Sequence, residues 1–338
     1  MASARRSAAG IRRPWRAPPP HRGLRTTGRA GQSGTGVAPL SAVIAHHFTI
    51  DLEEYFQVSA FESHVARSEW ERFECRLPGQ VTLLLELLAR HEARATFFVL
   101  GWVAERQAGL IRAIVRAGHE VASHGWDHAR VTRQTPHQFR HSIRRTKDVL
   151  EEISGAPVLG FRAPSFSIVP GREWALDILI EEGYRYDSSL FPVRRTGYGY
   201  PSGLPDPHWL ERPAGRLTEI PPTTLQWCGL HLPAAGGAYF RLLPYGVVRA
   251  ALRQCERRGV PGTFYIHPWE LDPAQPRVDV SWLTRIRHYG GLRRTARRIE
   301  RLLTEFRFIA VRDTLTARSG APPCVTRLPW SSFSETTS

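Results

Sequence analysis

The chain has 338 residues, 42% hydrophobic and 10% aromatic, which is enough for one large domain or two modest ones with a sizeable core. Its formal charge of +15 is uneven, because residues 1–40 carry eight arginines and no acidic residue or lysine. The absence of any run of about 18 apolar residues excludes a transmembrane helix.

The N-terminal segment, residues 1–42, mixes Arg, Pro, Gly, Ala and Ser without the apolar core of a signal peptide. We interpret it as a disordered basic tail, with a transit peptide, a nucleic-acid-binding arm or an unused upstream start as alternatives. Because no export signal is visible, we expect a cytoplasmic protein. The four cysteines include no CxxC pair, which favours free thiols over a disulfide framework or a zinc site.

The first predicted strand, residues 43–50, runs directly into three carboxylates, Asp51, Glu53 and Glu54. Side chains alternate along an extended segment, so Asp51 and Glu53 point the same way. One of them would ligate a metal ion while the other stays nearby as a base. An acidic loop that caps the next helix explains the stretch equally well.

Helices and strands alternate along the rest of the chain. Helices are predicted over residues 81–88, 103–117, 136–153, 172–182 and 245–257, and strands over 93–100, 158–161, 262–266 and 306–311. Such alternation predicts a largely parallel sheet, either open or closed into a barrel. Polar residues recur at the strand ends (Asp51, His124, Arg162 and Asp187), and a barrel collects such ends on one face.

Two histidines follow a short predicted strand in the sequence Ser123-His124-Gly125-Trp126-Asp127-His128. On one helical turn, two imidazoles four residues apart can reach a single metal ion. His137 and His141 have the same spacing, but they lie in an Arg-rich helix with no acidic third ligand. We therefore interpret that second pair as part of a solvated helix face.

The C-terminal half contains fewer periodic stretches. Residues 192–240 are rich in Pro and Gly and are predicted to form long loops that include a substrate wall. His267 follows a predicted strand, where a structural histidine is the alternative to a catalytic one. The predicted domain covers residues 43–318, and residues 319–338 are predicted to be a loose tail.

The segment over residues 285–301 carries seven arginines and one acid, Glu300. A solvated helix face is the favoured interpretation. Contact with an anionic substrate or with an anionic membrane surface is the functional alternative.

Five stretches stand in a fixed order between residues 44 and 312. They are TIDLEEYFQV (49–58), ASHGWDH (122–128), FRAPSF (161–166), YDSS (186–189) and YIHPWE (265–270). Together they resemble the polysaccharide deacetylases, the NodB-homology enzymes of carbohydrate esterase family 4. The subgroup found in bacterial exopolysaccharide loci that accompany exosortase systems is the most similar.

The resemblance implies an α/β fold, a distorted (β/α) barrel with fewer than eight complete units. It also implies a metal triad, an aspartate base and a histidine acid. By position, Asp51 matches the base, Arg162 matches the arginine that pairs with the base, and His267 matches the general acid. His124 and His128 match two of the metal ligands.

The common family motif has two adjacent aspartates, whereas this chain has Asp51-Leu52-Glu53. We assign Glu53 to the metal, in agreement with the alternation along the strand, and keep Glu54 as the competing ligand. The implied cofactor is one divalent ion, zinc, with cobalt or nickel as alternatives.

Further residues are candidates for substrate contact or for support of the site. Trp126, Tyr239 and Trp269 would stack on sugar rings, although aromatic side chains more often pack in a core. Asp187, in the YDSS stretch, is a candidate supporting residue.

The implied reaction is the metal-dependent removal of N-acetyl groups from the amino sugars of a bacterial polysaccharide. The expected partner is an N-acetylated polysaccharide or oligosaccharide, with peripheral contact to an anionic membrane surface through basic segments, and no nucleic acid. Two other functions stay open. One is a metal-dependent amidohydrolase acting on a small cyclic amide or ureide, and the other is a non-catalytic carbohydrate-binding protein.

Overall fold

The computed structural model of the chain describes residues 44–195, 197–317 and 325–327. The tail expected over residues 1–42 and most of the one expected over 319–338 lie outside these residues. The strands are β1 (Ala45–Leu52), β2 (Ala95–Val99), β3 (Glu120–Ser123), β4 (Gly160–Phe161), β5 (Tyr186–Asp187), β6 (His208–Arg212), β7 (Gly215–Glu219), β8 (Thr224–Trp227), β9 (Leu230–Pro233), β10 (Thr263–Ile266), β11 (Arg307–Ile309) and β12 (Val325–Arg327).

The helices follow the strands around the fold. They are α1 (Leu77–Arg90), α2 (Gly101–Arg106), α3 (Ala108–Arg116), α4 (Pro136–Ser154), α5 (Trp174–Glu181), α6 (Gly237–Leu242), α7 (Tyr245–Arg257), α8 (Trp282–Tyr289), α9 (Leu292–Glu305) and α10 (Val311–Ala317). A short 3-10 helix, η5 (Pro268–Leu271), follows β10. None of the described helices is long and apolar enough to span a membrane.

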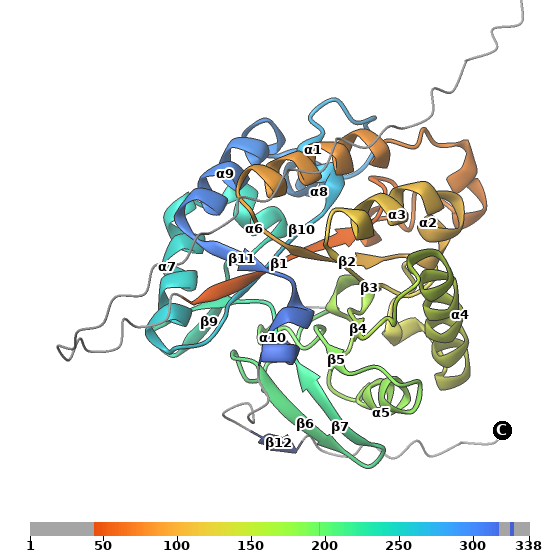
Figure 1. Cartoon of the computed structure of the whole chain (residues 1–338). Helices are drawn as coiled ribbons and strands as arrows, with labels where there is room; N and C mark the ends of the chain where they lie inside the picture. Colours follow the sequence, from red (N-terminus) through yellow and green to blue (C-terminus); the bar gives the residue numbers. More distant parts are fainter. Residues whose placement is uncertain (1–43, 196, 318–324, 328–338) are drawn as a thin grey trace, which may run out of the picture. The chain divides into compact units, whose positions relative to one another are not determined.

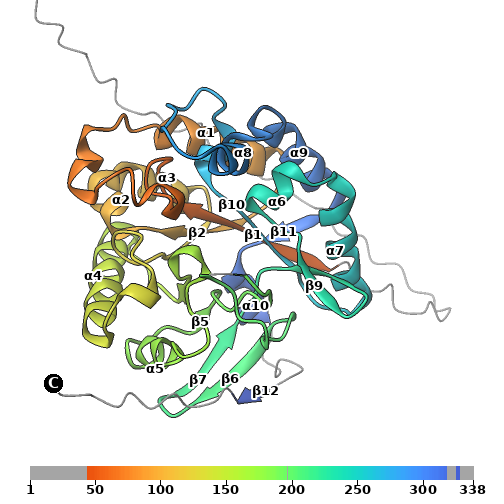
Figure 2. The same cartoon turned by 180° about the vertical axis from the view of Figure 1, so that it is seen from behind.

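The main sheet curves into a distorted barrel (Figures 1 and 2). Its strand order is β10-β1-β2-β3-β4-β5-β7-β6-β12, with β11 also paired to β1, and β6 and β7 form its antiparallel pair. The gap between β7 and β10 is bridged where the Thr223 backbone N–H donates to the Thr263 carbonyl at 3.1 Å. The expected α/β barrel fold is confirmed.

Helix α4 illustrates how the sequence directs the outer layer. Thr135 and Gln138 form a capping box at its start, and Gly155, with φ of 68°, ends it in the left-handed conformation. Phe139, Ile143 and Leu150 are buried at helical spacing. The helix therefore covers the barrel with one apolar face.

Two regions differ from the expectation of long loops or tails. Residues 192–240 contain strands β6 to β9 and the start of helix α6. Burial alternates along β6, but over only five residues, and such short strands escape a search for longer periodic runs. In the expected C-terminal tail, residues 325–327 form β12, which pairs with β6.

The parallel strands place their carboxyl ends on one face of the barrel, as expected for this architecture. Asp51 lies at the end of β1 and Asp187 ends β5. His124, Arg162 and His267 each follow directly after the last residue of a strand. The fold thus gathers residues that are up to 216 positions apart in the chain.

Candidate active site

Glu53, His124 and His128 are the one group of His, Cys, Asp and Glu side chains, among the described residues, that could hold a metal ion. Each offers a ligand atom, and these atoms all lie within 4.8 Å of one another. All three side chains are buried. Two imidazoles and one carboxylate form a donor set that catalytic zinc sites use, so the residues fit a divalent ion.

The two histidines lie on a loop after β3 instead of the helical turn that their spacing predicts. Gly125 and His128 both have positive φ, 73° and 57°, and this irregular backbone turns both rings inward, with centroids 5.5 Å apart. The exposed pair His137 and His141 lies on α4, as expected for a solvated face.

The ligand atoms are oriented by hydrogen bonds from outside the trio. His124 donates from Nδ1 to the Arg162 carbonyl at 2.8 Å, which leaves Nε2 free to face a metal. Trp269 donates from Nε1 to Glu53 Oε1 at 3.2 Å. Burial disfavours the charged Glu53, but His128 and His267 outweigh it and lower the Glu53 pKa to about 2.

Asp51 is paired with a guanidinium that is completely buried. Arg162 donates from Nη1 to Asp51 Oδ1 at 2.7 Å and to Thr49 Oγ1 at 2.8 Å, and from Nη2 to Ser188 Oγ at 2.8 Å. Its guanidinium carbon lies 4.2 Å from the ring centroid of Phe98. These contacts hold Asp51 in one orientation beside the metal-ligand trio.

His267 faces both carboxylates through Nε2, which lies 3.8 Å from Asp51 Oδ2 and 3.7 Å from Glu53 Oε1. Its Nδ1 donates to Glu270 Oε1 at 2.8 Å. Burial disfavours the imidazolium, but Glu53 and Glu270 outweigh it and raise the His267 pKa to about 9. The ring is therefore protonated at neutral pH.

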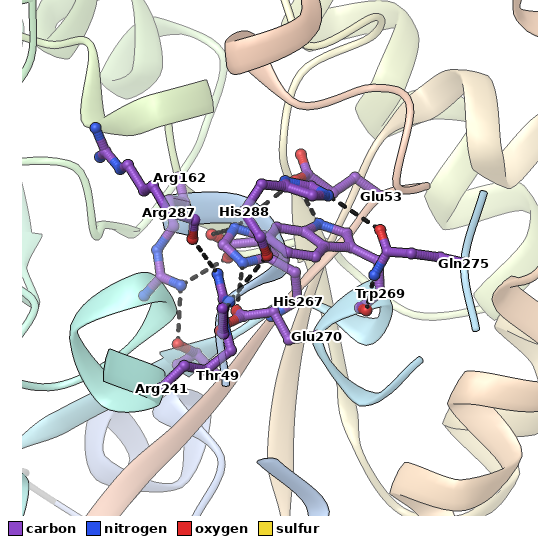
Figure 3. Close-up of polar contacts among 12 residues, drawn as sticks. Thr49, Glu53, Arg162, Arg241, His267, Trp269, Glu270, Gln275, Arg287 and His288 are labelled. Atoms are coloured by element: carbon purple, nitrogen blue, oxygen red, sulfur yellow. Dashed lines mark hydrogen bonds and ion pairs between the residues drawn. The ribbon is translucent and has the colours of Figure 1, made fainter. Parts of the chain in front are cut away.

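Figure 3 shows Trp269 lying between the rings of His267 and His288. The ring centroids are 5.1 Å and 4.2 Å apart, with interplanar angles of 20° and 16°. Trp269 is only 5% exposed. Its ring packs within the site and leaves little surface for a sugar.

Glu54 points away from the trio. Its Oε1 accepts from the backbone N–H groups of Arg76 and Leu77, at 2.9 Å and 3.3 Å, at the start of α1. A carboxylate at this position stabilises a helix start. Glu54 therefore caps the next helix, which is the alternative considered for this acidic stretch. Glu53 is the carboxylate that lies with the two histidines.

Asp187 lies beneath the site in a buried carboxyl pair. Asp187 accepts hydrogen bonds from the backbone N–H and the hydroxyl of Ser189. Glu219 lies beside it at the end of β7, and its Oε1 accepts from the Leu190 N–H at 3.0 Å. Burial and the neighbouring Asp187 charge raise the Glu219 pKa well above its ordinary value. Burial also raises the Asp187 pKa, to about 6, and the hydrogen bond between the two carboxyl groups favours a proton on Glu219 that is donated to Asp187.

The other two aromatic candidates lie in different surroundings. Tyr239 lines the cleft, and its hydroxyl is 2.7 Å from that of Tyr198. Trp126 is half-buried, with the Arg145 guanidinium carbon 3.3 Å from the centroid of its ring, and a Cβ at Gly101 would lie 2.3 Å from Cε3. The faces of Trp126 are therefore already in contact with protein.

A cleft of about 380 Å³ opens over the trio, Asp51 and His267. Sequence reasoning missed several residues that shape it, namely Ser59, Arg130, Ser165, Tyr198, Arg241 and His288. It also missed Glu270, although the three-residue spacing in His267-Pro268-Trp269-Glu270 is a signal that could have identified it. Ser165 lies in the FRAPSF stretch and Arg241 lies at the end of the expected substrate wall, whereas the others come from distant loops and helices without such a signal.

Two family models match adjacent segments of the chain. Residues 73–176 match the polysaccharide deacetylase family model, and residues 188–316 match a domain of unknown function, DUF3473, found in deacetylases of exopolysaccharide loci. The peptidoglycan-N-acetylglucosamine deacetylase PgdA of Listeria monocytogenes is 27% identical over 129 residues. That match covers 36% of this chain and 27% of the relative, so the chain spans well under half of that protein.

Two solved structures share the fold. One, from Mycobacterium smegmatis and assigned to the polysaccharide deacetylases, has a TM-score of 0.57 at 21% identity over 87% of this chain and 98% of its own. The PuuE allantoinase has a TM-score of 0.51 at 20% identity over 82% of this chain and 90% of its own. The family model over residues 73–176 identifies a polysaccharide deacetylase domain in this chain, and the two solved structures share its fold.

Proposed function

We propose that this protein is a metal-dependent N-deacetylase that acts on the N-acetylated amino sugars of a bacterial exopolysaccharide. One observation carries the proposal: Nε2 of His267 lies within 3.8 Å of both Asp51 Oδ2 and Glu53 Oε1, beside the buried trio. An acid, a base and a metal-ligand set thus face the same point in the cleft. The DUF3473 match supports an exopolysaccharide substrate.

The trio would hold one divalent ion, zinc by its donor set, with cobalt or nickel as alternatives. When bound, such an ion supplies a Lewis acid for the acetyl carbonyl and lowers the pKa of water. His124 and His128 orient their ring nitrogens towards the ion's position, and Trp269 holds one oxygen of Glu53.

Asp51 takes the proton of the attacking water, and Arg162 holds the carboxylate in the orientation that this requires. His267, protonated, gives a proton to the amine nitrogen as the carbon–nitrogen bond breaks, because an amine anion is a poor leaving group. Glu270 keeps Nε2 of His267 directed into the cleft by accepting from Nδ1. The products are acetate and a free amino sugar.

Acetate release from N-acetylated chito-oligosaccharides tests the proposal. The protein is treated with chelator and then supplied with zinc, cobalt or nickel. We expect metal to restore acetate release, and Asp51→Asn to abolish release while the variant still binds metal. Near-normal turnover in Asp51→Asn would disprove the assignment of the base.

Ring opening of allantoin, measured on the same metal-supplied protein, separates the proposed function from a cyclic-amide hydrolase, since an allantoinase shares the fold. Hydrolysis of allantoin without acetate release from any oligosaccharide would overturn the proposal. A cytoplasmic location, with deacetylation before export of the polymer, stays a prediction.

A further inference from the structure

Large apolar side chains gather on one part of the surface. The described residues contain seven that are exposed by 36% or more, and five of these lie at the end of α6 and on α8. We name these five the α6–α8 patch: Leu242, Leu243, Trp282, Leu283 and Ile286. Trp282 is 67% exposed, Leu283 62% and Ile286 53%, values that are unusual for such side chains unless they meet a partner.

The two segments form one surface, since α6 packs against α8 (Figures 1 and 2). Arg241, the residue before Leu242, donates to the carbonyls of Arg287, His288 and Gly290 at the end of α8. A Cβ placed on Gly290 would lie 2.7 Å from Leu242 Cδ2. The patch is therefore continuous from one helix to the other.

Arginines border the apolar stripe of α8. At 100° per residue, Trp282, Leu283 and Ile286 share one helix face, and the exposed Arg285 and Arg287 lie on its two sides. Helix α9 adds the exposed Arg293, Arg294 and Arg297. Within the described part of the chain, no carboxylate lies within 4.0 Å of any of these five guanidiniums.

We propose that the α6–α8 patch docks this protein on an anionic lipid bilayer. Tryptophan and aliphatic side chains enter the interfacial layer of a bilayer, and flanking arginines reach lipid phosphates while their stems stay in the apolar layer. Unpaired positive charge around an apolar centre is complementary to an anionic leaflet. In a symmetric dimer, the same face would instead bring two sets of arginines together.

The α6–α8 patch lies next to the cleft of the candidate active site. Thr284 and Arg287, on the same helix, line the cleft that holds Asp51 and His267. A bilayer bound at α8 therefore lies beside the mouth of the candidate active site, where a saccharide attached to lipid would be within reach. The docking itself does not depend on the proposed deacetylase activity.

Sedimentation of the full-length protein with vesicles tests the proposal. One set of vesicles contains phosphatidylethanolamine and phosphatidylglycerol, and the other contains only phosphatidylcholine. We expect the protein to partition to the anionic vesicles. The triple variant Trp282→Ser, Leu283→Ser, Ile286→Ser should bind them more than about tenfold more weakly, because it loses three apolar side chains.

A second variant tests the charges. Arg285→Gln with Arg293→Gln should weaken binding by about fivefold per arginine. The matched controls are Trp227→Ser on the β8–β9 hairpin, 64% exposed, and Arg185→Gln with Arg307→Gln, which lie at the amino ends of β5 and β11. Both controls should bind like the wild type. All variants retain residues 1–42, so the basic tail contributes equally to each.

Three outcomes would overturn the proposal. They are equal binding by the triple variant and the wild type, equal binding to phosphatidylcholine and anionic vesicles, and a wild-type dimer that the triple variant dissociates while neither protein binds vesicles. The last outcome would assign the patch to a second copy of the chain.

Folding and activity are checked separately. The triple variant should keep the melting temperature of the wild type and its acetate release from soluble oligosaccharide without vesicles. If no protein in the series released acetate, the deacetylase function would fail, and the vesicle result would stand by itself.

Discussion

His267 and Glu270 are joined by a hydrogen bond of 2.8 Å from the ring Nδ1 to the carboxylate Oε1, across the three residues that begin η5. The other oxygen of Glu270 accepts from Nε of Arg241, whose side chain is 1% exposed. Burial disfavours a charged Glu270, but Arg241 and His267 outweigh it and lower its pKa. The candidate acid is thus anchored through Glu270 to a buried cation.

Replacing Arg241 tests this anchor. Arg241→Gln leaves the buried Glu270 without its main counter-charge, and we expect the free energy of unfolding to fall by about 3–5 kcal/mol. The control is Arg301→Gln, because the Arg301 side chain is 58% exposed and pairs with Glu305 at 2.9 Å. That change should cost at most about 1 kcal/mol. Urea unfolding of both variants measures the difference, and equal losses would contradict a structural role for the buried pair.

The metal-ligand assignment leads to a second prediction. His124→Ala removes one of three ligands, so the metal bound after dialysis should fall from about one equivalent to near zero. His141→Ala on α4 removes an exposed histidine of the pair with identical spacing and should leave the metal content unchanged. Elemental analysis of both proteins checks this. A full equivalent of metal in His124→Ala would place the ion elsewhere.

The sequence predicts best those elements whose determining residues lie close together in the chain. The sequence predicts the helices over 136–153 and 245–257 to within one residue of their ends, because apolar spacing is a local signal and α4 also has local capping residues. The family motifs likewise brought Asp51, the two histidines and His267 to one site. Local signals were sufficient for these elements.

Long-range packing decided what sequence reasoning missed. The Arg-rich segment over 285–301 is two helices, since Gly291 has φ of 80° and a Cβ there would lie 2.6 Å from the Arg241 carbonyl oxygen. The helix expected over 103–117 is also divided, at Gln107, into α2 and α3. The partnership of Arg241 with Glu270, 29 residues apart, has no signature in either local sequence.

Substrate contact by Tyr239 is a third prediction. Tyr239→Ala should raise KM for an acetylated oligosaccharide by about 2- to 12-fold with little change in kcat, the loss expected for one aromatic contact. Trp126→Ala is the contrast, because Arg145 and Gly101 already cover its ring. It should reduce the free energy of unfolding and leave KM unchanged. A larger rise of KM in Trp126→Ala than in Tyr239→Ala would reverse the two roles.

The buried carboxyl pair gives stability a dependence on pH. In the folded protein, burial and the neighbouring Asp187 charge raise the pKa of Glu219, whereas an unfolded glutamic acid titrates near about 4.3. Above that pH the unfolded chain loses this proton and the folded one keeps it, so the free energy of unfolding falls as pH rises. The decline stops only above the raised pKa of Glu219.

Glu219→Gln isolates this contribution, because an amide has no proton to lose on titration and still has an N–H to donate to Asp187. Between about pH 5 and about pH 8, the wild type should lose at least about 1 kcal/mol of unfolding free energy relative to the variant, since one pKa unit corresponds to about 1.4 kcal/mol. Urea unfolding at both pH values measures the difference between the two proteins. Titrations of groups outside the carboxyl pair cancel in this difference, whereas the titration of Asp187, whose pKa burial raises to about 6, belongs to the pair. If the free energies of unfolding of the variant and the wild type changed equally with pH, Glu219 would be ionised in the folded protein. The proposed proton between Glu219 and Asp187 would then be absent.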